Sequence, residues 1–378
     1  MRKHASVTVA VLGVAALFAT ACGGGGKKSS STSATGSKAS GTPTVAIQAA
    51  AEGAPTYLGS FDPQPGLGGQ VPKKTIGFVN VLGSSPSAQA CQAEFERAAK
   101  TLGWTVKAAD AQGDPAKMAS DVNAMVTSNV DAVVTLAIEA AAAQQGLQAA
   151  KTKNIPALSF CGALTPSPLY KGIYAPNDNA IGALTVRYLI DDLPAKSEIV
   201  AQFYPPINAL ARRDLVAKAM LQDAGIKIVA SHQVDFKNPV QDTVQSTMDM
   251  LRAHPNAKAV LVDQDFEFAP VVQAIKQNNL NVKVYGMYGG ADALKALRAG
   301  GPARALSQST PQSSAWTVAD QLLKYFVNKK AIDPLALYDH PYPVTLITAG
   351  NVPKTDESPF PDYGPLYEAQ WKAEGYKY

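Results

Sequence analysis

Two cysteines of the predicted folded part, Cys91 and Cys161, are candidates for a disulfide or for a reactive thiol. Cys161 ends the short apolar run "ALSF", which is typical of a buried strand, and Cys91 lies on a stretch with the apolar spacing of a helix. Two thiols in an oxidising compartment can pair as a disulfide, whereas one thiolate with a histidine base beside it can act as a nucleophile. Choosing between these chemistries requires the compartment, the fold and the neighbours of each cysteine.

The N-terminal residues predict export. Arg2 and Lys3 precede the uncharged run "VTVAVLGVAALFATA", which is too short for a comfortable membrane span and ends in small residues, so residues 1–21 are predicted to be a signal peptide. The following "FATAC" is similar to the lipobox of bacterial lipoproteins, in which Cys22 would carry the lipid. The alternative is an ordinary secretory signal followed by an unrelated cysteine. A lipid on Cys22 would anchor the protein to the outer face of the cytoplasmic membrane without spanning it.

Two segments without a core pattern follow the predicted signal. Residues 23–42 consist mainly of Gly, Ser, Thr and Lys and show no apolar period, so residues 22–52 are predicted to be a flexible, lipid-anchored tether. Residues 53–73 are rich in Pro and Gly and are predicted to lie as an irregular strap over the first lobe, with continued disorder as the alternative. The net charge of +4 is spread thinly along the chain, which argues against nucleic acid as a partner.

The remaining chain, residues 74–378, is too long for one ordinary core and shows strands alternating with helices. "TIGFVNVLG" is a strand-like run, and Cys91, Phe95 and Ala98 in the next segment share one helical face. "EIVAQFY" at residues 198–204 opens a second set of alternating elements. The predicted fold is therefore α/β, with two doubly wound lobes built on parallel sheets.

The motifs that would indicate an enzyme or a nucleotide site are missing from the sequence. The chain has no P-loop, no G-x-G-x-x-G after a strand, no Gly-x-Ser-x-Gly elbow and no metal-ligand spacing of His or Cys. No predicted strand-end loop of the first lobe offers a histidine to activate Cys161. These absences argue against an enzyme, and the sequence predicts no cofactor and no metal site.

Longer runs identify a family resemblance. The first lobe, with "DAQGDPAKM" and "NIPAL", and the second, with "IVASHQVDF", "MLRAHPNAKAVLVDQD" and "VYGMYGGADALKAL", resemble type I periplasmic binding proteins of the ribose-binding-like group over residues 74–350. The resemblance implies two lobes joined by three hinge crossovers near Pro176, Gln308 and His340. It also implies a ligand in the cleft between the lobes and delivery of that ligand to an ABC importer.

The same resemblance sets the expected lobe boundaries. Residues 74–176 and 309–340 are assigned to the N-terminal lobe, and residues 177–308 and 341–378 to the C-terminal lobe. Because ligands of open α/β sheets bind at the carboxyl ends of the strands, the cleft should be lined by the residues that follow each strand. The candidate ligand contacts are Ser85, Ser87, Cys161, Asn177, Tyr204, Arg212, Arg213, Phe236, Gln264, Tyr288 and Gln308.

Several of these positions depart from the pattern of the sugar-binding members. The aromatic clamp of the first loop is absent, and Cys161 and Gly162 stand where the family carries an Asp-Arg pair. Leu136 replaces an Asn and Tyr288 replaces an Asp, and the alignment does not choose between Arg212 and Arg213. With fewer polar partners for hydroxyl groups, the expected ligand is a sugar or a sugar-like compound that can be partly aromatic. For each candidate aromatic residue the alternative is ordinary core packing.

The two cysteines of the folded part can meet at this rim. Helices of a doubly wound sheet begin at its carboxyl edge, so the start of the helix with Cys91 and the end of the strand before Cys161 face the same edge. A disulfide between Cys91 and Cys161 is therefore a candidate, with two buried free thiols as the alternative.

The sequence as a whole predicts a monomeric, lipid-anchored solute-binding protein that docks on an ABC permease. The alternative is a ligand-sensing co-receptor for a membrane sensor kinase, without transport. A third interpretation is a degenerate binder whose cleft takes no small molecule.

Overall fold

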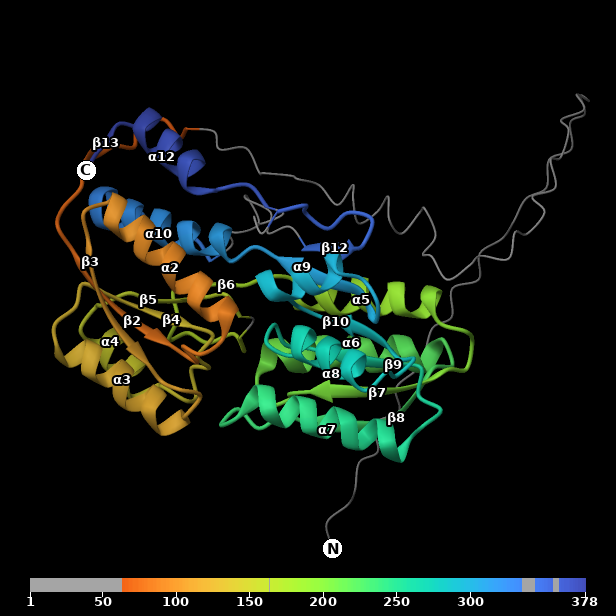
Figure 1. Ribbon diagram of the computed structural model, residues 1–378. Helices are drawn as coiled ribbons and strands as arrows, with labels where there is room; N and C mark the ends of the chain where they lie inside the picture. Colours follow the sequence, from red (N-terminus) through yellow and green to blue (C-terminus); the bar gives the residue numbers. More distant parts are fainter. Residues whose placement is uncertain (1–62, 163, 335–343, 356–359) are drawn as a thin grey trace, which may run out of the picture. The chain divides into compact units, whose positions relative to one another are not determined.

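The computed structural model describes residues 63–378 except 163, 335–343 and 356–359 (Figure 1). All described residues belong to one compact unit. The predicted signal peptide, Cys22, the tether and the first half of the predicted strap lie outside the described residues.

The first lobe is built on a five-stranded sheet in which all strands are parallel, in the order β3-β2-β4-β5-β6. Its strands are β2 (Thr75–Asn80), β3 (Thr105–Asp110), β4 (Ala132–Leu136), β5 (Ala157–Phe160) and β6 (Gly172–Tyr174). Its connecting helices are α2 (Pro86–Thr101), α3 (Pro115–Thr127) and α4 (Gln144–Thr152). Ser85 starts α2 because its side chain accepts a hydrogen bond from the Ala88 N–H and Pro86 follows at the first helical position.

The second lobe is built on a six-stranded sheet in the order β12-β11-β10-β9-β7-β8, in which only β12 runs antiparallel to its neighbour. Its strands are β7 (Glu198–Phe203), β8 (Lys227–Gln233), β9 (Ala259–Val262), β10 (Lys283–Gly286), β11 (Ala303–Ser309) and β12 (Val344–Thr348). Its helices are α5 (Asp178–Asp192), α6 (Asn208–Asp223), α7 (Pro239–Ala253), α8 (Phe268–Gln277) and α9 (Ala291–Arg298). The predicted α/β fold with two parallel-sheet lobes is confirmed.

Both faces of the second sheet are buried. Along β7, Ile199 and Ala201 belong to one apolar core, whereas Val200 between them belongs to the core on the other face. This alternation follows from the two-residue period of a strand and requires helices on both sides. In the first lobe, Phe78 of β2 stacks on Phe95 of α2 with ring centroids 5.6 Å apart.

The chain passes between the lobes close to the expected positions. It leaves the first sheet after β6, and α5 then packs against β11 and β12 of the second lobe. It returns after β11 through α10 (Pro311–Asn328), which packs on α2 and β5 of the first lobe. The crossover expected near His340 lies outside the described residues.

The C-terminal segment corrects the predicted boundary that placed all of residues 341–378 in the C-terminal lobe. Only β12 joins the second sheet, whereas α12 (Gly364–Ala373) and β13 (Tyr376–Lys377) return to the first lobe and lie beside α10 (Figure 1). The reason is aromatic burial, because Tyr367 and Trp371 belong to the first-lobe core. The Trp371 ring also lies 5.5 Å from that of Trp316 on α10.

The described part of the predicted strap runs along the first lobe. β1 (Gly69–Gln70) pairs in parallel with β13, and Val71 is buried in the first-lobe core. The carbonyl oxygen of Pro72 accepts a hydrogen bond from the Trp104 indole at 3.2 Å. The two ends of the described chain therefore stabilise each other on the same lobe.

Candidate ligand-binding site

A cavity of about 240 Å³ is lined by residues of both lobes. Its lining comes from the segments at and after the ends of β2, β3, β4, β5 and β6 of the first sheet and β7, β8, β9 and β10 of the second. This is the carboxyl edge of both sheets, where open α/β folds hold their ligands. The cavity lining includes the predicted contact residues Ser85, Ser87, Cys161, Tyr204, Arg213, Phe236, Gln264 and Tyr288.

Three predicted contact residues do not line the cavity. Asn177 is exposed, and its side chain caps α5 by accepting a hydrogen bond from the Ala180 N–H at 3.0 Å. Arg212 is half-buried on α6 but does not reach the lining, since its neighbour Arg213 takes that side of the helix. Gln308 lies within β11 opposite Thr345 of β12, one residue before the sheet ends.

Arg213 is a buried cation in the cavity wall. Its Nε atom donates to the Asp178 carboxylate at 2.8 Å, and one terminal nitrogen donates to the Asp263 carbonyl oxygen at 3.1 Å. The guanidinium also lies 4.9 Å from the centre of the Tyr288 ring. Burial, the largest single cause, would lower the pKa of Arg213. The charge and hydrogen bond of Asp178, together with Tyr288 and Asp263, outweigh it and raise that pKa, so the group stays positive.

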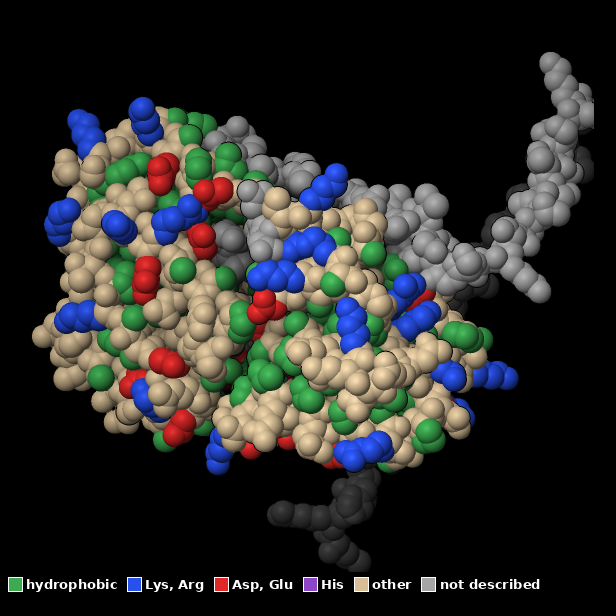
Figure 2. Space-filling view, in the orientation of Figure 1, with side chains coloured by type: hydrophobic (Ala, Val, Ile, Leu, Met, Phe, Trp, Pro, Cys, Tyr) green, Lys and Arg blue, Asp and Glu red, His purple; other side chains and the backbone are tan. Residues whose placement is uncertain are grey.

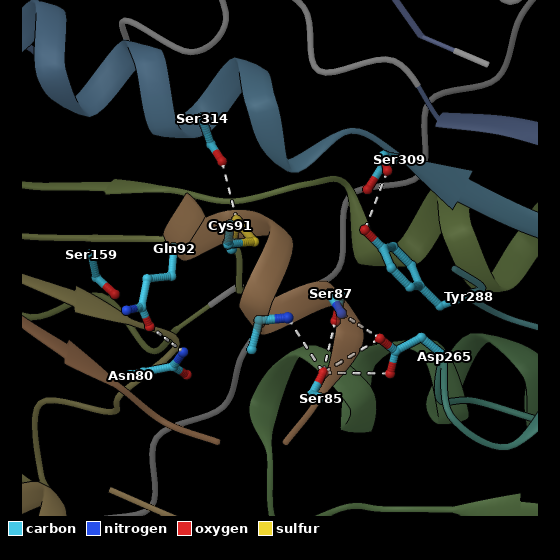
Figure 3. The surroundings of a disulfide bond; sticks show 12 residues. Asn80, Ser85, Ser87, Cys91, Gln92, Ser159, Asp265, Tyr288, Ser309 and Ser314 are labelled. Atoms are coloured by element: carbon cyan, nitrogen blue, oxygen red, sulfur yellow. Dashed lines mark hydrogen bonds between the residues drawn. A yellow bond between two sulfur atoms is a disulfide. The ribbon is translucent and has the colours of Figure 1, made fainter. Parts of the chain in front are cut away.

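Asp265 was missed by the comparison of residues with the family, although it is one of the residues that follow β9. Its carboxylate accepts a hydrogen bond from the Ser87 N–H at 2.6 Å, and the Ser85 hydroxyl lies 3.4 Å from the same oxygen (Figure 3). Burial raises the pKa of Asp265, and the hydrogen bond from the Ser87 backbone offsets part of that rise. Asp265 therefore ties the second lobe to the N-terminus of α2 in the first.

A group of buried carboxyl side chains lies behind this wall. The Glu267 carboxylate accepts hydrogen bonds at 2.9 Å from the backbone N–H groups of Asp263 and Gln264. Burial is the main cause that raises the pKa of Asp263 to about 6 and that of Asp214 to about 9. Within the described residues, these and the other acidic, His and Cys side chains form no cluster that could hold a metal ion.

Aromatic side chains from the second lobe close another side of the cavity. The rings of Tyr204 and Phe236 stack with centroids 3.9 Å apart, and the Phe266 ring meets Phe236 edge-on at 5.8 Å. Phe236 also packs against the core of the first lobe. The aromatic group thus contacts both lobes at the cavity.

The sulfur atoms of Cys91 and Cys161 form a disulfide in the cavity wall (Figure 3), with the two Cα atoms 6.5 Å apart. It joins α2 to the turn after β5, where Cys161 adopts a left-handed backbone conformation with φ of 61°. The next residue must be small, because a Cβ atom on Gly162 would lie 2.6 Å from that of Ala137. This part of the cavity wall is thus formed by sulfur atoms and a glycine, without a charged side chain.

On the face in Figure 2, Lys and Arg side chains are interspersed with Asp and Glu over the first lobe, whereas Lys and Arg predominate over the second. Among the described residues, no helix combines the length and the apolar character needed to cross a membrane. The cavity is therefore the feature of the described chain that most resembles a binding site.

Comparisons with known proteins agree with this geometry. A model of the periplasmic binding protein domain matches residues 76–330. The ribose import binding protein of Bacillus subtilis is 24% identical over 236 residues, which cover 62% of this chain and 76% of that protein. A xylitol-binding protein of Mycolicibacterium smegmatis is 26% identical over 220 residues, covering 57% of this chain and 62% of that protein.

A solved structure supports the same fold. The solute-binding protein of a 5-methylthioribose transporter from Thermotoga lettingae, in complex with 5-methylthioribose, superposes with a TM-score of 0.67 at 19% identity. The match covers 79% of this chain and 97% of that one. At this identity it shows a shared fold and carries no information on the ligand of this chain.

Proposed function

The chain belongs to the periplasmic binding protein family, and from this premise we propose that it captures a sugar or sugar-like solute, including a partly aromatic one, for an ABC importer. The family binds solutes and does not catalyse reactions. The proposed ligand lies in the cavity between the lobes, and its binding closes the lobes by a hinge motion. The closed form would then dock on the permease as a monomer.

The observation that carries this proposal is the cavity at the carboxyl edges of both sheets. Its wall holds Arg213, whose side chain is buried, and Gln264, whose amide nitrogen is buried without a hydrogen-bond partner among the described residues. A buried donor without a partner costs free energy, which a ligand oxygen would recover. Sugars and polyols present such oxygens.

The proposed location is the outer face of the cytoplasmic membrane, through a lipid on Cys22. Residues 23–52 would then keep the binding lobes within reach of a permease. Metabolic labelling with a radioactive fatty acid, compared between the full chain and Cys22→Ser, tests this part. Equal labelling of the two chains would refute the lipid anchor on Cys22. It would leave the proposal of ligand binding unaffected.

The ligand proposal is tested by titration calorimetry and thermal shift on the chain from residue 23 onward. The probes are ribose, xylitol, arabinose and their substituted derivatives. A ligand that binds the folded state should raise its melting temperature. Gln264→Ala and Tyr288→Ala should weaken binding, while Arg212→Ala, whose side chain lies outside the lining, should not. Unchanged affinity in both cavity variants would contradict the site.

A further inference from the structure

The first-lobe wall of the cavity is apolar. It consists of the buried side chains Val81, Leu82, Ala88, Met118, Leu136 and Leu164. The polar side chains that the first lobe adds to the lining are Ser85, Ser87 and Glu139. All three already have partners: Ser85 and Ser87 contact Asp265, and Glu139 accepts a hydrogen bond from the Thr165 N–H at 3.1 Å.

The disulfide extends this apolar wall. Bonded sulfur atoms carry no S–H donor, and Gly162 beside them has no side chain. A hydroxyl group of a ligand placed against the disulfide and Gly162 would lose its hydrogen bonds to water and find no donor or acceptor side chain in these two elements of the wall. An alkyl, thioether or aryl group would instead gain contacts with apolar atoms and with polarisable sulfur.

The second lobe supplies the polar part of the cavity. The Gln264 amide nitrogen is buried and has no partner among the described residues. Arg213 uses three of its five N–H groups in contacts with Asp178 and Asp263, so two remain for a ligand within the described residues. Donors for a ligand therefore come from the second lobe, which also adds aromatic rings, whereas the first lobe adds mainly apolar surface.

We propose that the solute is a polyhydroxy compound with an apolar substituent, whose hydroxyl groups contact Arg213 and Gln264 and whose substituent packs against the first-lobe wall and the disulfide. This inference rests on the proposed function and names the class of ligand for the same cavity. An unsubstituted polyol would leave the first-lobe wall in contact with water or with empty space. Such a ligand would bind less favourably, because water does not fill apolar cavities favourably.

Matched pairs of probes test this inference by titration calorimetry. Each pair joins a parent compound and its substituted derivative, namely ribose with 5-methylthioribose, ribose with phenyl riboside, and xylitol with a benzyl ether of xylitol. At least one derivative should bind about tenfold or more tighter than its parent, since one group in an apolar pocket is worth roughly 10–200-fold.

Two wall variants and one matched control locate the substituent. Leu136→Asn and, as a second variant in case the first fails to fold, Met118→Gln should each reduce the preference for the derivative at least about fivefold. Leu215→Asn makes the same kind of change at an α6 side chain that is 71% exposed, and it should leave the preference unchanged.

The outcomes separate this inference from the proposed function. If ribose or xylitol binds as tightly as every derivative, the inference is overturned while solute binding stands. If no probe of any pair binds, both fall. A preference for the derivative that survives Leu136→Asn and Met118→Gln would place the substituent elsewhere and overturn the assignment of the first-lobe wall.

Discussion

Arg213 and Asp178 form a buried ion pair at the edge of the cavity. The Asp178 side chain is fully buried and that of Arg213 is 8% exposed, with 2.7 Å between a terminal guanidinium nitrogen and the carboxylate. Such pairs add little net stability, but breaking one leaves an uncompensated buried charge. Their value here is to hold a cation at a fixed point of the binding surface.

The ion pair makes a clear prediction for stability. Arg213→Ala should lower the free energy of unfolding by about 3–5 kcal/mol, because Asp178 would stay buried without its cation. The double variant Arg213→Ala/Asp178→Asn should recover part of this loss. Urea unfolding followed by circular dichroism measures both. Equal losses in the single and double variants would show that the charge of Asp178 is not the cause.

Asp214 predicts a pH dependence. Burial, together with the neighbouring charge of Asp263, raises the pKa of Asp214 to about 9 from its ordinary value of 3.8. The folded state then keeps a proton that the unfolded state releases, so stability falls as pH rises from about 4 to about 9. Asp214→Asn should reduce this slope, leaving the part due to Asp263, and gain at least about 1 kcal/mol at pH 9 relative to pH 5. The free energy of unfolding is measured across this pH range for both proteins. The same dependence on pH in the two proteins would contradict the prediction.

Single residues also show how far the sequence could locate the cavity. Parallel strands end at one edge, so Cys161, Gln264 and Tyr288 could be predicted from strand order alone. Which of Arg212 and Arg213 faces inward could not, because neighbours on a helix point about 100° apart and the phase of α6 depends on packing. Strand order places Asp265 at the carboxyl edge, but its contact with Ser87 depends on how the two lobes meet, which the sequence does not show.

At the scale of elements, the disulfide is the strongest tie within the first lobe. It connects residues that lie 70 positions apart in the chain and fixes α2 against the turn after β5. The mature protein with Cys22 replaced should therefore show no free thiol when it is denatured without a reductant. Two titratable thiols would instead show that Cys91 and Cys161 are reduced.

Removing the disulfide should also cost stability. The double variant Cys91→Ser/Cys161→Ser is expected to lose about 2–4 kcal/mol in the free energy of unfolding, because the unfolded chain regains the freedom of a long loop. Urea unfolding of the double variant and the oxidised parent measures the difference. An unchanged free energy would mean that the disulfide shapes the cavity without stabilising the lobe.

The C-terminal helix is the element that sequence reasoning placed in the wrong lobe. Its apolar spacing predicts a helix but not its partner, and a family pattern that ends near residue 350 says nothing about it. The partner is set by tertiary packing, since the buried Trp371 indole donates to Asp320 of α10 at 2.9 Å.

This helix can be tested without disturbing the cavity. Trp371→Ala should destabilise the protein by about 3–5 kcal/mol through the loss of a buried ring. Trp371→Phe should cost less, since it keeps an aromatic ring and loses only the donor to Asp320. Ligand affinity should stay unchanged in both, because Trp371 does not line the cavity. If a variant that is fully folded under the assay conditions binds ligand more weakly, this helix contributes to the site.

At the scale of the whole molecule, the two lobes meet through few polar contacts near the cavity. Asp265 contacts Ser85 and Ser87 across the lobes, and Phe236 of the second lobe packs against the first-lobe core. These contacts favour a closed arrangement. If the protein exchanges between open and closed forms, each such contact shifts the balance by its own free energy.

Asp265→Ala should therefore open the unliganded protein. The substitution removes the acceptor for the Ser87 N–H, a charge-assisted bond of 2.6 Å, while Asp265→Asn keeps an acceptor and serves as the matched control. Small-angle X-ray scattering should show a larger radius of gyration for Asp265→Ala without ligand and the parent value at saturation. The apparent Kd should rise about tenfold, since a smaller fraction of the protein is ready to bind. A contact of Asp265 with the ligand alone would weaken binding but leave the unliganded radius unchanged, so the scattering of the free protein decides between the two roles.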